Sequence, residues 1–288
     1  MPWRCPTAAR TRRVADIAAR SGPRFDSLVH VTRDGRWTTG RHDASYARLV
    51  AELDRARVER ACLVGLPGVV DNEYVLECAA ASGGRLVPIA GVNPVEFAAP
   101  DALPSRIAAL ARSGFVGIKL HPRLNGFDPL DERSIAAIQA AASGRLVVFL
   151  DTLFRQRALA ARHAADTIDA LVHACPSASI VLLHGGGPAL LDVAEIVRVN
   201  PALVLDLSFT TLYYSGSSLE RDVRWVMERL DQRVVIGSDM PEFTPAETFE
   251  YAERLADTLS AEKWANIAHR NLDRLFPVRA GAAAATRH

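Results

Sequence analysis

The chain has 288 residues, of which 49% are apolar, enough to bury a sizeable core, and its formal net charge is +1. That near-neutral balance argues against binding to nucleic acid or to an anionic membrane surface. No apolar run reaches the roughly 18 residues of a membrane-spanning helix. The four cysteines lack CxxC spacing, which favours free thiols and a cytoplasmic location. We expect one domain over residues 23–277, between a loose N-terminal extension (1–22), which has no secretion-signal core, and a disordered tail (278–288).

Eight short apolar runs recur along the chain, separated by stretches rich in alanine, arginine and leucine. Their spacing is close to the roughly 30 residues of a strand–helix–strand unit. This rhythm predicts a single-domain α/β fold, the (β/α)₈ TIM barrel, in which functional groups stand at the carboxyl ends of the strands. The expected strands are residues 25–30, 61–65, 86–91, 115–121, 146–151, 180–184, 203–206 and 234–239.

Glycine and proline residues mark the ends of several helices between these strands. Two long segments, 31–41 and 208–218, follow the first and seventh strands as loops. Trp37 and Tyr213 lie in them and are expected to line a substrate pocket. The backbone of the glycine run 185–187 is expected to approach a ligand. The expected helices cover residues 14–19, 105–113, 131–142, 165–175 and a stretch from about 190 to 200.

Titratable side chains end most of the expected strands. Because residues two apart share one face of a strand, we expect every second side chain to point into the barrel. The aligned sets are Asp26, Leu28 and His30; Lys119 and His121; Phe149 and Asp151; Leu182 and His184; and Val235, Gly237 and Asp239. This alignment predicts three imidazoles, two carboxylates and one ammonium in one barrel mouth.

Such a set is suited to two kinds of chemistry. Imidazole and carboxylate groups can hold a divalent cation. They can also carry acid–base catalysis in which Asp239 acts as base and imidazoles polarise a carbonyl. Lys119 is one of only two lysines in the chain, and a compact ammonium differs in function from an arginine fork. Two residues also have purely structural interpretations, since Asp26 can anchor the turn into its strand and Asp206 can cap a helix or anchor a loop.

Five segments carry a recognisable pattern. They are Asn93-Pro94 after the third strand, GIKLHP at 117–122, LHGGG at 183–187, GSDMP at 237–241 and NIAHRNLDRLF at 266–276. On these segments the chain resembles the amidohydrolase superfamily, in particular its amidohydrolase-2 branch. The resemblance implies a barrel enzyme that hydrolyses amides, esters or lactones, or that decarboxylates aromatic and enol acids. Many members bind one Zn²⁺ or Mn²⁺, and members of this branch often form homodimers.

The metal ligands usual in that family are incomplete here. They are two histidines in an Asp-x-His-x-His strand, a histidine ending the fifth strand and the aspartate ending the eighth. Leu28 stands where the first histidine belongs and Asp151 replaces the fifth-strand histidine, so only His30 and Asp239 remain. We therefore expect no metal cofactor, as in relatives that hydrolyse lactones without one. The alternative is a weak Zn²⁺ or Mn²⁺ site formed by His30, Asp151 and Asp239.

The leading hypothesis is hydrolysis of a lactone or ester-like ring in a small, anionic molecule. The expected catalytic residues are Asp239, which activates water, His184, which polarises the carbonyl, and His30. Lys119 and Arg123 are expected to hold a substrate carboxylate. The full set of expected substrate-binding residues is Lys119, His121, Arg123, Asp151, Trp37 and Tyr213. The alternatives are a metal-dependent, non-oxidative decarboxylase and a catalytically silent binding barrel.

Overall fold

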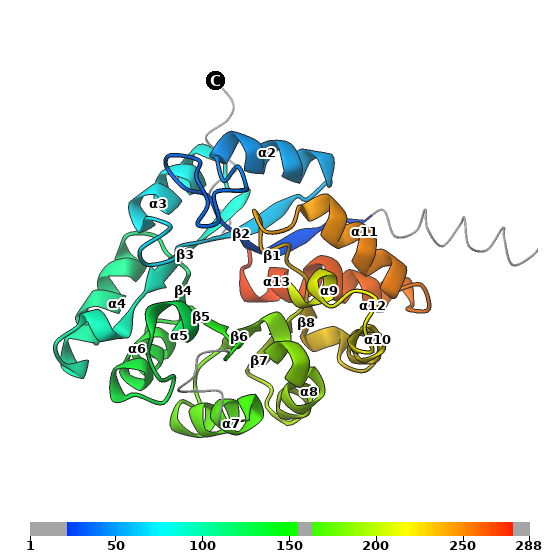
Figure 1. The fold of residues 1–288 in the computed structure, drawn as a ribbon. Coiled ribbons are helices and arrows are strands. Elements are labelled where there is room, and N and C mark those ends of the chain that lie inside the picture. Colours follow the sequence, from blue (N-terminus) through cyan, green and yellow to red (C-terminus); the bar gives the residue numbers. More distant parts are fainter. Residues whose placement is uncertain (1–21, 155–162, 279–288) are drawn as a thin grey trace, which may run out of the picture.

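The alternation of strands and helices along the chain produces a barrel. A computed structural model describes residues 22–154 and 163–278 of the protein. Its eight strands form one sheet in which each strand pairs in parallel with the next along the chain. The helices lie around the outside of this sheet (Figure 1). The predicted (β/α)₈ barrel is therefore confirmed. The 14–19 helix, the rest of the extension before residue 22 and the tail beyond residue 278 fall outside the described residues.

The strands lie close to the expected runs. The first, fifth and sixth are one residue shorter than predicted, the fourth is three residues shorter and the eighth is four residues shorter. The strands are β1 (Phe25–Val29), β2 (Arg60–Val64), β3 (Leu86–Val92), β4 (Gly117–Leu120), β5 (Val147–Asp151), β6 (Ile180–Leu183), β7 (Leu203–Asp206) and β8 (Val234–Val235).

Four of the helices, α4, α6, α7 and α8, match the helices expected between residues 105 and 200. The Asp131 side chain accepts a hydrogen bond from the Arg133 N–H and so caps the start of α6. The loop expected at 208–218 contains the short helix α9. The helices are α2 (Tyr46–Arg55), α3 (Asn72–Ala81), α4 (Leu103–Arg112), α5 (Pro122–Asn125), α6 (Glu132–Ser143), α7 (Ala164–Ala174), α8 (Leu190–Val199), α9 (Thr210–Tyr213), α10 (Leu219–Arg229), α11 (Pro245–Leu255), α12 (Ala261–Ala265) and α13 (Asn271–Leu275), with the shorter helical turns η1 (Pro94–Glu96), η2 (Pro100–Ala102), η3 (His184–Ala189), η4 (Asp231–Arg233) and the π-helical η5 (Asn266–Arg270).

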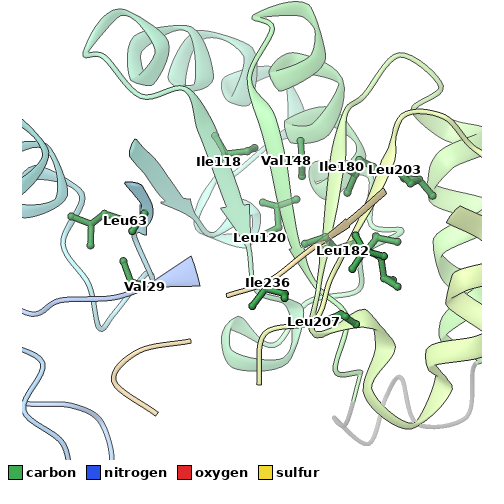
Figure 2. Close-up of a cluster of buried hydrophobic side chains, with 14 of the residues drawn as sticks. Val29, Leu63, Ile118, Leu120, Val148, Ile180, Leu182, Leu203, Leu207 and Ile236 are labelled. Carbon is green, nitrogen blue, oxygen red and sulfur yellow. The ribbon is translucent and has the colours of Figure 1, made fainter. Parts of the chain in front are cut away.

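The barrel has two apolar cores because its parallel strands are covered on both faces. The larger core lies between the strands and the helices, and Figure 2 shows strand side chains that belong to it, such as Ile118 and Val148. The smaller core fills the barrel interior. There the Phe276 ring, just after α13, stacks on Phe149 with ring centroids 6.1 Å apart. The active site of such a barrel is expected at the carboxyl ends of the strands, where polar residues follow them here.

Two expectations from composition can be compared with the described residues. Cys62, Cys78 and Cys175 are buried and free, as the scattered cysteine pattern predicted. Among residues 22–154 and 163–278, none of the helices has the length and apolar character that crossing a bilayer requires.

The predicted alignment in β6 is wrong. Val181 and Leu183 belong to the interior core, whereas Leu182 belongs to the core beneath the helices. Continued alternation would therefore point His184 away from the barrel axis. Instead His184 has a φ of 65°, in the left-handed region that few non-glycine residues adopt. This turn of the backbone, and not strand periodicity, directs the imidazole into the mouth.

The predicted alignment in β1 is also interrupted. The register with β2 shifts between Asp26 and Val29, as at a β-bulge. Phe25 and Leu28, which are three residues apart, consequently both belong to the interior core. The Oδ1 atom of Asp26 accepts a hydrogen bond from the Leu28 N–H at 3.1 Å, so Asp26 anchors its strand, as its structural interpretation predicted.

The eighth strand was expected to continue to Asp239, but regular pairing ends at Val235. Asp239 has a φ of 57°, which takes the chain out of the strand conformation. The barrel closes on β1 through three main-chain hydrogen bonds: from Ser27 N to Ile236 O (3.0 Å), from Asp239 N to Leu28 O (2.9 Å) and from His30 N to Met240 O (2.8 Å). The expected inward alignment through Gly237 is therefore replaced by a tight turn that β1 holds in place.

A close approach of two glycines between β2 and β3 provides a test of the packing. A Cβ atom on Gly91 would lie 2.7 Å from the carbonyl carbon of Gly65 and 2.8 Å from the Leu66 nitrogen. Both atoms are backbone and cannot move cheaply, so Gly91→Ala should lower the free energy of unfolding by about 1–3 kcal/mol. Gly144→Ala is the matched control, because its nearest atom would be 3.4 Å away. Urea unfolding of both variants checks this, and equal midpoints would contradict it.

Candidate active site

Residues from three different strand ends meet around the His30 ring. Its Nδ1 atom lies 2.6 Å from the Val64 carbonyl oxygen and must donate a proton to it, which leaves Nε2 as an acceptor. The Lys119 ammonium lies 3.4 Å from this Nε2, and the nearest carboxylate oxygen of Asp239 lies 3.7 Å from it. Burial, together with the neighbouring Lys119 charge, holds the pKa of His30 well below its usual value. His30 is therefore a neutral, oriented imidazole between an ammonium and a carboxylate.

Lys119 itself is buried at the end of β4. Burial lowers the pKa of Lys119, and the negative charges of Asp239 and Asp151 oppose this effect. An ammonium in this position is stabilised by the two carboxylates rather than by bulk water. The signal that singled out Lys119 in the sequence, a rare lysine at a strand end, thus corresponds to a residue in the middle of the polar cluster.

Asp151 ends β5 and connects two further histidines. Its Oδ2 atom lies 3.2 Å from the Nε2 atoms of both His121 and His184, and 3.8 Å from the Arg123 guanidinium. Burial opposes ionisation of Asp151, but the surrounding His121, His184 and Arg123 outweigh it and hold its pKa below the usual value. Burial lowers the pKa of His121 to about 3, and its Nδ1 atom accepts from the Leu124 N–H. His121 is therefore a neutral imidazole whose Nε2 atom faces Asp151.

The neighbours of His184 favour its protonated form. Burial alone would lower its pKa, but contact with Asp151 and the charge of Asp239 raise the pKa of His184 above its usual value. Its Nδ1 atom donates to the Ser208 hydroxyl at 3.0 Å, and that hydroxyl in turn donates to Asp206. Asp206 also accepts from the His184 main-chain N–H at 3.1 Å. The structural interpretation of Asp206 as a loop anchor is confirmed, and it also fixes His184.

Asp239 is the carboxylate best placed to act as a base. Its side chain is 13% exposed, whereas Asp151 and Asp206 are fully buried, so water reaches Asp239 most readily. Burial raises the pKa of Asp239 to about 6, against the opposing charges of His184 and Lys119. A general base works best when its pKa lies near the operating pH. Asp239 meets that condition near neutrality.

Aromatic side chains pack against His30 and His184. Trp37 is buried and stacks on His30 with ring centroids 5.5 Å apart, and its indole N–H donates to Glu242 at 2.6 Å. Tyr213 is 56% exposed and stacks on Phe209 at 4.5 Å, and Phe209 in turn meets the His184 ring edge-on at 5.8 Å. The structure thus places Trp37 directly against a cluster histidine and Tyr213 one ring further out.

Sequence reasoning missed three participants, namely Ser208, Phe209 and Glu242. Each is a single polar or aromatic residue in an irregular segment, where no periodicity marks orientation. The glycine run 185–187, expected to approach a ligand, also has a packing role. A Cβ atom at Gly186 would lie 2.6 Å from Val193, and one at Gly187 would lie 2.7 Å from Leu153. These glycines are therefore needed for packing against the protein itself.

The donor set does not fit the divalent cation that the family resemblance implies. Within the described ranges, no three His, Cys, Asp or Glu side chains are placed so that they could hold a metal ion. Leu28 has no donor atom, and Asp151 faces His121 and His184. The Lys119 ammonium stands at the only free nitrogen of His30. A positive ammonium there opposes a second cation, so no step below is assigned to a metal.

The fold and the polar strand ends are those of a barrel enzyme, and the comparisons identify its family. The family model described as Amidohydrolase matches residues 41–278, so the chain belongs to the amidohydrolase family. This confirms the resemblance found in the sequence motifs. No curated protein matches the sequence significantly.

Solved structures share the fold at low sequence identity. An uncharacterized TIM-barrel protein, Bb4693 from Bordetella bronchiseptica, has a TM-score of 0.74 at 17% identity, over 88% of this chain and 98% of that one. A probable 2-pyrone-4,6-dicarboxylic acid hydrolase from Acinetobacter baumannii, with citric acid bound, has a TM-score of 0.65 at 17% identity, over 88% and 98%. The 5-carboxyvanillate decarboxylase of Novosphingobium aromaticivorans, complexed with manganese, has a TM-score of 0.64 at 13% identity, over 89% and 96%.

The raised pKa of Asp239 predicts that replacing it with an uncharged residue stabilises the protein in a pH-dependent way. An acid whose pKa is 3.8 when unfolded and about 6 when folded destabilises the native state once the pH rises through this interval. At pH 8 the free energy of unfolding of Asp239→Asn should therefore be about 3 kcal/mol higher than that of wild type. This difference should shrink through pH 6 and vanish below about pH 4. Urea unfolding across this pH range measures it. Asp192→Asn, at an exposed position on α8, should show no such trend.

Proposed function

We propose that this protein hydrolyses a lactone or similar ester-like ring in a small, anionic molecule, with Asp239 activating the water. The observation that carries the proposal is the meeting of one accessible carboxylate with two buried cationic groups. Asp239 feels the charges of both His184 and Lys119, and His30 lies between Lys119 and Asp239. A base beside fixed positive charge is the arrangement that ester hydrolysis requires.

In the proposed reaction Asp239 takes a proton from water while the water oxygen bonds to the ring carbonyl carbon. Negative charge develops on the carbonyl oxygen, and the charges of Lys119 and His184 stabilise it. The ring C–O bond then breaks, and the proton on Asp239 passes to the departing ring oxygen. The product is an open-chain hydroxy acid or its enol form, and Asp239 returns to its ionised state.

The remaining cluster residues would orient these groups and attract the substrate. Neutral His30, fixed by Val64, keeps its Nε2 atom towards Lys119. Asp151 would hold His184 on the side opposite Ser208. The Arg123 side chain is 40% exposed and provides a guanidinium that can bind a carboxylate in a bidentate manner. These charges support an anionic substrate.

Asp239→Asn should abolish most of the ring-opening activity, because an amide cannot accept the proton from water. Loss of a general base typically costs 10²–10⁴-fold in rate, so kcat should fall by about that factor. Loss of ring absorbance across a panel of carboxylated lactones measures it, with Asp192→Asn as control. Undiminished ring opening by Asp239→Asn would refute the proposed role. Release of CO₂ from aromatic acids, without ring opening, would favour the decarboxylase alternative.

The pH dependence of the same reaction should follow the ionisation of Asp239. The base works only when it is ionised, and burial raises its pKa to about 6. We expect kcat/KM to be constant above about pH 7 and to fall about tenfold per pH unit well below pH 6. Steady-state rates between pH 4.5 and 8.5 check this. A profile that stays flat down to pH 4.5 would exclude Asp239 as the base.

A further inference from the structure

The proposed base lies on the least regular part of the barrel wall. Strand β8 has only two residues, and Asp239 follows it in a turn with positive φ. The neighbouring strand β1 is irregular at the same level, since its register shifts between Asp26 and Val29. A ladder of strand hydrogen bonds therefore does not by itself fix the height and direction of Asp239. The main-chain hydrogen bonds to β1 come from Ile236, Asp239 and Met240, so Ser238 needs a contact of another kind.

The Asp26 side chain makes that contact. It is fully buried, and its Oδ1 atom accepts hydrogen bonds from two main-chain N–H groups, that of Leu28 at 3.1 Å and that of Ser238 at 2.9 Å. One donor belongs to the irregular part of β1, and the other is the residue immediately before the base. A single acceptor atom thus joins the two irregular segments across the closing seam of the barrel.

The other contacts of the turn lead back to the same short stretch of β1. The Asp239 N–H donates to the Leu28 carbonyl at 2.9 Å, and the Ser238 hydroxyl donates to that carbonyl at 3.5 Å. Gly237 lies so close to Ser27 that any Cβ atom there would overlap the Ser27 hydroxyl. Because these contacts leave little room for adjustment, a displacement at Asp26 would be transmitted to Ser238 and then to Asp239.

We propose that Asp26 is a positioning residue for Asp239. Its Oδ1 atom accepts a hydrogen bond from the Ser238 N–H and so orients the base, and this acceptor role does not require a negative charge on Asp26. The inference rests on the proposed function of Asp239. Among the described residues, no hydrogen-bond donor meets the second carboxylate oxygen of Asp26. In agreement with this, burial raises the pKa of Asp26 to about 7. An asparagine, which is uncharged and keeps the accepting oxygen, should therefore replace Asp26 with little loss.

Three substitutions separate positioning from other roles. Asp26→Ala removes the acceptor and should lower kcat by about 10- to 100-fold, as expected for a misplaced catalytic group, with KM changed less than about twofold. Asp26→Asn should retain kcat within about threefold at pH 7.5, as should the exposed control Asp192→Ala. If Asp26→Ala fails to fold, Asp26→Glu takes its place, because its extra methylene displaces the acceptor and should lower kcat. An Asp26→Asn variant as impaired as Asp26→Ala, or unchanged kcat in folded Asp26→Ala, would overturn the proposal.

Hydrogen exchange gives a second readout that needs no substrate. Amides of the segment 236–242 should exchange at least tenfold faster in Asp26→Ala than in wild type, whereas Asp26→Asn should match wild type. Equal exchange in all three proteins would overturn the proposed contact. If Asp239→Asn keeps its ring-opening activity, the role of Asp239 as base fails, yet the exchange rates still decide whether Asp26 holds the turn. The two failures are therefore distinguishable.

Discussion

The mouth of this barrel depends on keeping several charged groups stable away from water. Lys119, Asp151 and His184 are all buried, and an isolated buried charge costs many kcal/mol unless oppositely charged or hydrogen-bonding groups surround it. Here Asp151 lies between His121 and His184, and Lys119 lies near Asp239 and Asp151. Because each charge needs the others, the cluster holds its geometry before any substrate arrives, which is the condition for electrostatic stabilisation of a reaction.

Histidine has two different electrostatic roles in this cluster. Burial lowers the pKa values of His30 and His121, and the positive charge of Lys119 lowers both further. His184 is equally buried, but Asp151 and Asp239 raise its pKa. Burial therefore lowers the pKa of all three histidines, and only at His184 do the neighbouring carboxylates outweigh it. The three imidazoles therefore differ in how readily they hold a second proton, and His184 does so most readily.

Backbone strain is concentrated at the same place. His184, Phe209 and Asp239 all have positive φ, a conformation that non-glycine residues adopt only when surrounding contacts hold them there. For His184 those contacts include Asp206, which accepts from its N–H, and Thr210, whose hydroxyl donates to its carbonyl at 2.6 Å. The network of buried hydroxyl and carboxylate groups beneath the mouth thus explains how strained residues keep one orientation.

The sequence by itself determined the barrel, its strand positions and which residue types stand at the strand ends, because burial of parallel strands on both faces leaves a local pattern of apolar runs. It also singled out Lys119, Asp151 and Asp239. Periodicity could not give the direction of His184, the bulge in β1 or the early end of β8, since all three depend on positive φ or on contacts between segments far apart in the chain. Ser208, Phe209 and Glu242 were missed for the same reason. Only the tertiary structure decided which histidine has a raised pKa, because burial and neighbouring charges set a pKa and the order of residues reveals neither.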